Sequence, residues 1–255
     1  MSAGRIAIIG TGNVATHLIE WFEAADFQVT SVYTRSPEAN QHLTIPLRTN
    51  LNYRDEVCSF ILIATKDDAV AEVADQLSNT GDAIVLHTSG SVPLEAIDKK
   101  NFAGTGVLYP LQTLQKDREV ALNEVPFLLE GRNQGDLRRI EDLCKTVGIH
   151  YSTASSEERM YYHVSAVMSA NFTNHLLFLA EKFLASHSLN VEVLRPLLME
   201  TVKKAFEQGA FNSQTGPAKR GDQKTIDRHK ELLDDVHAKG LYEAFSQSIL
   251  STYRQ

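Results

Sequence analysis

Residues 5–15, RIAIIGTGNVA, place a short apolar strand directly before a Gly-x-Gly-x-x-Ala turn. In such a turn Gly10 allows the chain to reverse sharply, and Gly12 lets the backbone come close to phosphate oxygens. The small side chain of Ala15 keeps the following helix tight against the sheet. This order of strand, turn and helix predicts a doubly wound α/β domain that binds a dinucleotide.

The helix after the turn begins near Asn13 and runs to about Ala25, with apolar residues at helical spacing. Its first amides, around Asn13 and Val14, have no acceptor within the helix and lie at the positive end of its dipole. They suit an anion without any charged side chain. The alternative is a purely structural glycine turn in a domain that binds no cofactor.

Composition limits the classes of partner. The chain has 255 residues, 43% of them apolar, and a formal charge of -7. An acidic protein lacks the broad basic face that nucleic acid or an anionic membrane requires, so we expect neither partner. The two cysteines, Cys58 and Cys144, lie far apart in apolar runs, which predicts buried free thiols, no metal site and a cytoplasmic protein.

Two patterns divide the chain at about residue 152. Up to that point strands alternate with helices, which predicts a parallel sheet with right-handed crossovers; the expected strands are 5–9, 28–33, 60–64, 83–87, 106–109, 126–130 and 149–152. From about residue 155 the apolar period is helical throughout, with expected helices at 156–186, 190–210, 222–238 and 240–253. The sequence therefore predicts a Rossmann-type domain over 1–152 and an all-α domain over 153–255.

The end of the second strand selects between the two nicotinamide cofactors. A cofactor with a free ribose 2′-hydroxyl normally meets an Asp or Glu here. This chain has Thr34, Arg35 and Ser36 instead, and a guanidinium with a hydroxyl suits a 2′-phosphate, so NADP is favoured over NAD. Alternatively, Arg35 is a solvated loop residue and Ser36 only caps the next helix, which would begin at Pro37.

Two later strand ends supply further candidates. Ligands in open α/β sheets lie beyond the carboxyl ends of the strands, so Ala64, Thr65 and Lys66 are expected to flank the cofactor. Lys66 could equally be a solvated side chain. The next strand ends in His-Thr-Ser-Gly-Ser, residues 87–91, where His87 and Ser89 could hydrogen-bond substrate and His87 could exchange a proton. Alternatively, His87 is a satisfied strand-end residue.

These motifs, followed by Tyr-Pro-Leu-Gln-Thr at 109–113 and an all-helical domain, resemble the 6-phosphogluconate dehydrogenase-like superfamily. Within it the chain is most similar to a family of NADP oxidoreductases that pair a Rossmann-like domain with a helical domain of unknown function. The resemblance covers nearly the whole chain. It implies NADP as cofactor but no particular substrate, because that family has no agreed reaction.

One departure from related families affects the chemistry. Prephenate dehydrogenases carry His-Pro where this chain has Tyr109-Pro110, so no catalytic imidazole is carried over to that position. The resemblance implies that the long helix beginning near 156 lines a substrate pocket, with Asn171 as its amide. The turn at 215–222 resembles a family signature, and its Lys219 and Arg220 could bind a carboxylate or phosphate. An ordinary exposed turn would look similar.

We therefore expect an NADP-dependent oxidoreductase that moves a hydride to or from a small anionic keto, hydroxy or imino compound, and that forms a homodimer by analogy with related helical domains. Two alternatives stay open. One is a non-catalytic sensor that binds NADP without turnover. The other is an enzyme similar to prephenate dehydrogenase, which Tyr109 disfavours.

Overall fold

The computed structural model describes residues 4–98 and 102–254. The chain divides into two compact units, residues 1–170 and 171–255. The proposed domain boundary at 152 follows a different criterion, the end of the sheet, and stays a prediction. Among the described residues, no helix has the length and apolarity needed to cross a membrane.

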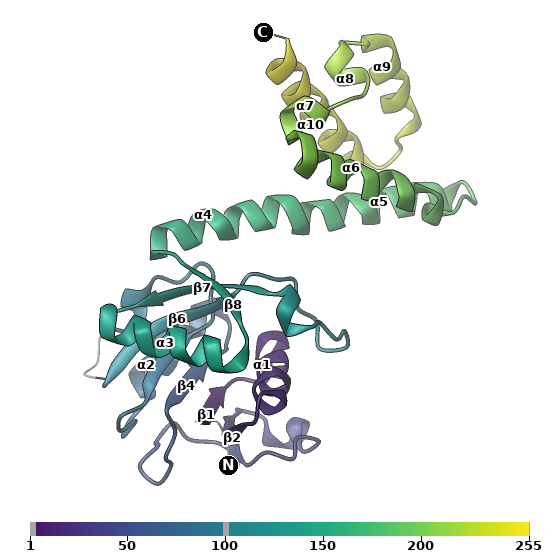
Figure 1. Ribbon diagram of the computed structural model, residues 1–255. Helices are drawn as coiled ribbons and strands as arrows, with labels where there is room; N and C mark the ends of the chain where they lie inside the picture. The colour runs from purple at the N-terminus through teal and green to yellow at the C-terminus, as the bar shows by residue number, and fades with distance from the viewer. Residues whose placement is uncertain (1–3, 99–101, 255) are drawn as a thin grey trace. The chain divides into compact units, whose positions relative to one another are not determined.

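The first unit contains one sheet. Within the described residues its eight strands follow the order β3-β2-β1-β4-β5-β6-β7-β8. Their bounds are β1 Gly4–Ile9, β2 Phe27–Tyr33, β3 Leu47–Arg48, β4 Phe60–Ile63, β5 Ile84–His87, β6 Gly104–Pro110, β7 Pro126–Gly131 and β8 His150–Thr153. The predicted doubly wound α/β fold is thereby confirmed (Figure 1).

Helices cover both faces of this sheet. On one face α1 (Asn13–Ala24) and α3 (Gln134–Val147) bury the outward side chains of β1 and β7, such as Ile8 and Phe127. On the other face α2 (Val70–Gln76) packs against Ile9 and Ile61. The alternation of strand residues between two apolar clusters is the expected pattern of a sheet that is buried on both sides.

One strand contradicts the expectation of a wholly parallel sheet: β7 runs antiparallel to β6. The physical reason is the connection between them, residues 111–125, whose single helical turn is the 3₁₀ turn Leu122–Glu124. A parallel crossover usually runs through an α-helix, which this connection lacks, whereas an antiparallel return needs none. The strand β3 was missed because two residues carry no periodic signal.

The second expected helix of the first unit is also absent. After β2 the chain forms only the 3₁₀ turn Pro37–Asn40, and 3₁₀ turns likewise occupy Asp67–Ala69 and Leu94–Ala96. The last helix of this unit, α4 (Ser156–Ala166), begins with a capping box in which the Ser155 side chain accepts from the Glu158 amide. A π-helical segment, Val167–Asn171, follows α4 and spans the boundary between the units.

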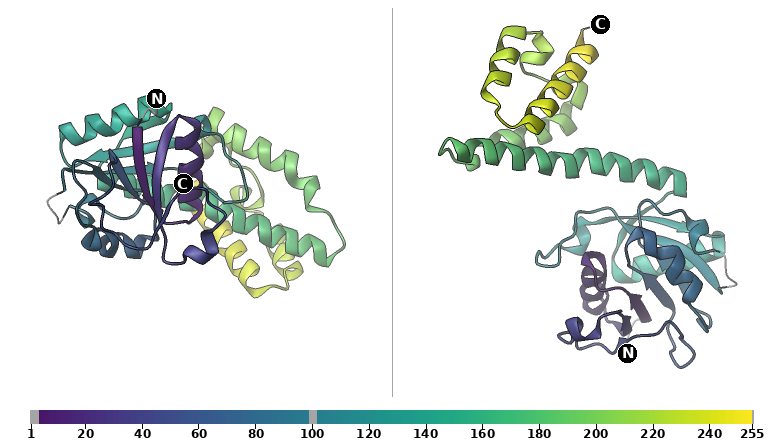
Figure 2. Two further views of the ribbon diagram at one scale, coloured as in Figure 1. Left: turned by 90° about the horizontal axis from the view of Figure 1, so that it is seen from below. Right: turned by 180° about the vertical axis from the view of Figure 1, so that it is seen from behind.

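The second unit is helical, as expected, and its elements are seen from two more sides in Figure 2. They are α5 Phe172–Ser186, a 3₁₀ turn Val191–Leu194, α6 Arg195–Gln208, α7 Ala210–Ser213, α8 Pro217–Arg220, α9 Gln223–Leu232 and α10 Val236–Tyr253. The expected boundary near 239 is wrong. Asp235 caps α10 by accepting from the amides of His237 and Ala238, so that helix starts earlier.

Candidate functional site at the carboxyl edge of the sheet

Five strand ends, four of which carry predicted site residues, lie along one edge of the sheet. Neighbouring strands β2, β1, β4, β5 and β6 are all parallel, so their carboxyl ends point the same way. Strand order reverses between β1 and β4, which is where ligands bind in open α/β sheets. With about 4.8 Å between strands, the ends of β1 and β6 are roughly 14 Å apart.

Gly10 has a structural requirement that Gly12 does not share. The φ angle of Gly10 is +118°, and a Cβ there would lie 2.4 Å from the carbonyl oxygen of Ala64. Gly12 has no neighbouring atom within 4 Å of the position of a Cβ. Because nothing in the fold demands a glycine at position 12, the empty space beside it fits the close approach of a ligand's phosphates.

The first turn of α1 has room for an anion. Gly12 is the N-cap and provides no side-chain hydrogen bond, and no acidic residue lies in the first turn. The amides of Asn13, Val14 and Ala15 therefore have no acceptor inside the helix. With the helix dipole they form the kind of site that holds a pyrophosphate.

The loop after β2 carries the positively charged side chain of Arg35 at the same edge. The hydroxyl of Thr34 accepts from the Ser36 amide at 3.2 Å and from the Asn40 side chain at 3.2 Å. Asn40 also donates to the Ser36 carbonyl at 2.8 Å. These buried bonds fix the loop while Arg35 and Ser36 themselves stay exposed, so both side chains are free to meet a 2′-phosphate.

The loop after β4 contributes mainly backbone. Ala64 is buried and its amide donates to Ile9 at 2.8 Å, which ties this loop to the glycine turn. Thr65 is half-buried and Lys66 is exposed. Asp67 in the same loop accepts from the hydroxyl of Ser91 in the loop after β5, which links the two loops.

His87 is buried more deeply than a side chain that donates a proton to substrate needs to be. It is fully buried, and burial lowers its pKa to about 3, helped by the nearby Arg159 charge and opposed by Asp67 and the Pro93 backbone. The Ser89 amide donates to Nδ1 at 3.2 Å, which places the ring proton on Nε2. His87 is therefore neutral near pH 7 and orders the loop that follows it.

Ser89 is the centre of that loop. Its Oγ accepts from the amides of Ser91 and Val92 at 3.1 Å and 3.0 Å, and the side chain is buried. Ser89 thus shapes the loop, and because its oxygen already accepts from two amides, the hydroxyl proton is what it could offer a substrate.

A buried ion pair holds the same loop from the other side. Arg159 on α4 is 1% exposed and pairs with Glu130 of β7, and its guanidinium donates to the Val92 carbonyl at 2.7 Å. Ser156 completes the network by donating to Glu130 at 2.7 Å and accepting from the Leu94 amide at 3.0 Å. The start of α4 is thus fixed against the loop after β5.

Next to this network a phenol meets an imidazole. The Tyr109 hydroxyl at the end of β6 lies 3.1 Å from Nδ1 of His163 on α4. Gly90 packs directly beneath both rings, since a Cβ there would lie 2.6 Å from His163 Nδ1 and 2.8 Å from the Tyr109 oxygen. Both side chains are half-buried, and burial together with Asp67 raises the pKa of Tyr109.

Three predicted residues belong to the second unit. Asn171 ends the π-helical segment and is exposed. Lys219 donates to the Gln214 carbonyl at 2.8 Å and lies over the Tyr253 ring, while Arg220 is exposed. Asp222, at the end of the same turn, caps α9. The roles of Asn171, Lys219 and Arg220 stay predictions.

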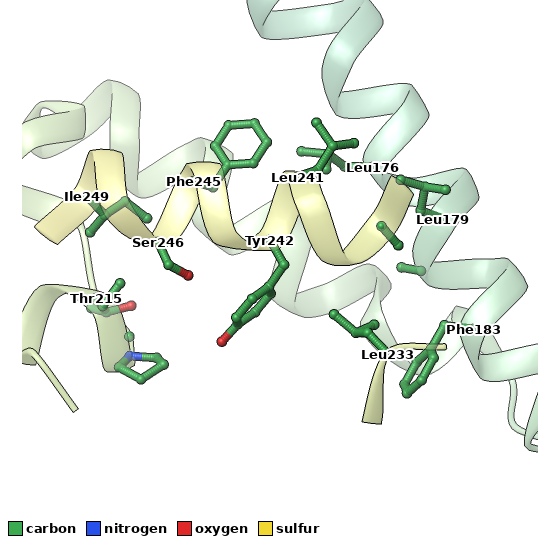
Figure 3. A pocket seen from close by; sticks show the side chains of 15 residues that line it. Leu176, Leu179, Phe183, Thr215, Leu233, Leu241, Tyr242, Phe245, Ser246 and Ile249 are labelled. Carbon is green, nitrogen blue, oxygen red and sulfur yellow. The ribbon is translucent and has the colours of Figure 1, made fainter. Parts of the chain in front are cut away.

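The second unit also has an apolar pocket of about 480 Å³ (Figure 3). Its walls come mainly from α5 and α10, including Leu176, Phe183, Leu241 and Phe245. Thr215 and Pro217 of the predicted anion-binding turn line it too. With so few polar groups this pocket does not suit a small anion.

The predictions from the sequence did not include Arg159 or Glu130, and they did not pair Tyr109 with His163. Arg159 stands between two glutamates and a methionine at the start of a helix, a context typical of a solvated charge. Its only available signal was its position three residues after Ser156, on the same helical face. The partners come from β7 and from the loop after β5, far away in sequence.

Two family descriptions match the chain. Residues 5–89 match the family described as NADP oxidoreductase, coenzyme F420-dependent, and residues 125–249 match a domain of unknown function, DUF2520. The first match covers the glycine turn and four of the five strand ends described above. No curated protein matches the chain.

Solved structures extend the similarity over the full length. A protein from Bacteroides fragilis, provisionally assigned as an NADP oxidoreductase, is 33% identical over 97% of this chain and 98% of its own, with a TM-score of 0.86. An imine reductase from a Pseudomonas species (14% identity, 98% of each chain, TM-score 0.73) shares the fold. So does a 1-pyrroline-5-carboxylate reductase from Streptococcus pyogenes (12% identity, 97% of this chain and 98% of its own, TM-score 0.62).

Proposed function

Because the chain belongs to the family of NADP oxidoreductases that join a Rossmann-type domain to the DUF2520 helical domain, we propose that it catalyses hydride transfer between NADP and a small anionic keto, hydroxy or imino compound. The observation that carries this proposal is the arrangement of the sheet edge. An anion cradle, an exposed cation and a polar loop follow one another along neighbouring strand ends. NADPH supplies a hydride to an electrophilic carbon when it is bound.

Each part of the edge has one role in this proposal. The turn and first helical amides, Gly10, Gly12, Asn13, Val14 and Ala15, hold the pyrophosphate. Arg35 and Ser36 bind the 2′-phosphate, with Thr34 fixing their loop. Ala64, Thr65 and Lys66 flank the cofactor between these loops and the loop after β5. His87 and Ser89 keep that last loop in shape beside the substrate.

Three residues of the second unit complete the proposal for the substrate. Asn171 would supply an amide hydrogen bond, and Lys219 with Arg220 would bind the negative charge of the substrate through charge-assisted hydrogen bonds. Replacing Arg220 with Ala should therefore raise KM and leave the dissociation constant of NADPH unchanged. Equal loss of both would indicate a role in folding.

The cofactor assignment is tested by calorimetric titration of NADPH and NADH into the wild type and Arg35→Ala. We expect NADPH to bind more tightly, and Arg35→Ala to weaken NADPH by about tenfold to a hundredfold, as expected for a hydrogen bond to a charged group, without affecting NADH. Arg54→Ala is the matched control, because this exposed arginine lies in the segment that enters β4 at the opposite edge. If Arg35→Ala and Arg54→Ala behave alike, Arg35 does not bind the phosphate.

The reaction is tested by following the absorbance of NADPH with small keto acids and cyclic imino acids. Oxidation that depends on one of these compounds supports the proposed function. Tight binding of NADPH with no oxidation by any of them would overturn it in favour of a protein that senses the cofactor. The direction of transfer follows from repeating the assay with NADP and the corresponding hydroxy or amino acids.

We also propose that the chain works as a homodimer in the cytoplasm. Within residues 171–254 only Ala218 and Ile226 are buried, while Val193, Met199 and Phe206 are 77%, 68% and 90% exposed. An apolar surface of this kind resembles half of a domain core, the usual form of an obligate homodimer interface. Both cysteines are free thiols, which fits a reducing compartment. Light scattering should give twice the mass of one chain.

A further inference from the structure

We propose that Tyr109 is the catalytic proton donor of this site and that His163 supplies its proton. This inference rests on the proposed hydride transfer and names the groups that complete it. Nothing in the sequence alone joins the two residues, which are 54 positions apart and come from a strand end and a helix. Their contact is a property of the fold.

The first argument is position. Tyr109 is the next-to-last residue of β6, which is parallel to β5, and His87 pairs with Val107 in the register. Tyr109 therefore lies farther toward the carboxyl edge than the end of β5, beside the loop of Ser89 and Gly90. His163 reaches the same place from α4, whose start is fixed by the Arg159–Glu130 pair.

The second argument is that both side chains remain available. Tyr109 and His163 are half-buried, whereas His87 is completely buried and neutral, with a pKa of about 3. Among the titratable side chains beside the loop after β5, the Tyr109–His163 pair has a route to solvent and His87 has none. A proton that enters at His163 can pass to Tyr109 and on to a substrate.

The third argument is the absence of a side chain at position 90. A Cβ there would overlap both His163 Nδ1 and the Tyr109 ring, each at 2.6 Å. The loop that would lie under a substrate is therefore in direct contact with the pair. A glycine here is compatible with the 3.1 Å contact between the two rings, and any larger residue displaces one of them.

The chemistry balances without a further reactant. In reduction, a C–H bond forms at the substrate carbon with the two electrons of the hydride, and the π electrons of the C=O or C=N bond move to the oxygen or nitrogen. That atom takes the phenolic proton of Tyr109 as the O–H bond of Tyr109 breaks. The phenolate oxygen takes the proton from Nδ1 of the His163 imidazolium, which is later recharged from solvent. Oxidation runs the same transfers backward.

The surrounding charges favour a protonated phenol. Burial and the carboxylate of Asp67 raise the pKa of Tyr109, and Arg159 acts in the opposite direction. The phenol thus keeps its proton near neutral pH until a negative charge develops on the substrate. Since reduction consumes a proton that enters through His163, the rate of reduction should fall as the pH rises.

The experiment compares Tyr109→Phe and His163→Asn with matched controls, Tyr162→Phe and His150→Asn, which alter exposed side chains. The first readout needs no cofactor. Imidazole ¹⁵N NMR of the wild type should show neutral His163 as one tautomer, protonated on Nε2, because Nδ1 accepts from Tyr109. Tyr109→Phe should give a mixture of tautomers, and Tyr162→Phe should not. An unchanged His163 in Tyr109→Phe would overturn the pairing.

The second readout is turnover with NADPH and a keto or imino acid that the wild type reduces. Tyr109→Phe should lower kcat by about a hundredfold or more with the NADPH dissociation constant unchanged. His163→Asn should lower kcat less and should abolish its decrease with pH. This variant keeps Asp67, Arg159 and His87, so a pH dependence that survives in it belongs to those groups and contradicts the role of His163.

The outcomes separate the two proposals. If NADPH binds and no substrate is reduced by the wild type, the proposed function fails and the proton donor fails with it. If the wild type turns over and Tyr109→Phe is equally fast, only the proton donor is wrong. Gly90→Ala offers an independent check, because its Cβ would overlap both rings of the pair; it should lower kcat, and a variant as fast as the wild type would contradict the role of the contact.

Discussion

In the first unit Ile6, Ile8 and Phe22 are completely buried, whereas in the second unit Phe206 is 90% exposed and α5, α6 and α10 contain no buried residue. The sheet and its helices thus form two complete apolar cores, one on each face of the sheet. The helical unit leaves its apolar side chains without an equivalent core. Helices in proteins owe most of their stability to the packing of an apolar face, so we expect these side chains to be covered by another surface, as in the proposed homodimer.

The two units also differ in how firmly they hold their candidate site residues. The candidate site of the first unit is shaped by buried bonds such as those of Thr34 and Ser89, so its geometry is present before any ligand binds. Sites built on such elements lose little free energy to ordering when a ligand arrives. The exposed Asn171 and Arg220 of the second unit have no comparable support among the described residues.

The largest effect should follow from Gly10→Ala in the glycine turn of the first unit. The new Cβ would overlap the Ala64 carbonyl at 2.4 Å, in a backbone conformation with φ of +118°. Strain and overpacking should together lower the free energy of unfolding by roughly 4 kcal/mol or more. Chemical denaturation followed by circular dichroism measures this.

Gly12→Ala is the matched control for that change. Its Cβ meets nothing within 4 Å, so the free energy of unfolding should stay the same. The methyl group would instead stand where the pyrophosphate comes close, and NADPH binding should weaken by about tenfold or more, or about 1.4 kcal/mol. Equal destabilisation by both alanines would mean that the two glycines serve the fold alone.

A smaller effect is expected in the second unit from Phe206→Ser. If a second copy of the chain covers this surface, the loss of a buried phenyl group should cost about 3 kcal/mol, make the melting temperature more dependent on protein concentration and lower the mass seen by light scattering. Val57→Ser in the first unit removes a side chain that is 72% exposed and should change stability by less than about 0.5 kcal/mol. Should Phe206→Ser match Val57→Ser, the surface faces solvent.

The sequence predicted the first unit better than the second, because a parallel sheet fixes where its strand ends lie. In a parallel sheet, strand ends share an edge, so motifs at Gly10, Arg35 and His87 could be placed together from their order alone. Periodicity also found the strands to within two residues, apart from β3, but it missed the direction of β7, because the connection before β7 forms no crossover helix.

The pairing of side chains was beyond such reasoning. Arg159 with Glu130, and Tyr109 with His163, join residues separated by 29 and 54 positions. Neither pair has a local pattern, because each partner lies on a different element and the packing between elements decides which faces meet. The burial of His87 also follows from packing between elements. The sequence therefore could not show that His87 is too deeply buried for its expected role as a proton donor.

The smallest effect concerns that buried imidazole. The unfolded chain takes up a proton on His87 near pH 6.5, whereas the folded protein excludes it until about pH 3. Stability from this group is complete above pH 6.5 and decreases as the pH falls, by about 2 kcal/mol between pH 7 and pH 5. In His87→Asn the amide oxygen can still accept from the Ser89 amide, but it cannot titrate, so this part of the pH dependence should disappear in denaturation curves measured at both pH values. The exposed His150→Asn should keep the wild-type dependence, and a His87→Asn variant that also keeps it would show that His87 binds its proton in the folded state.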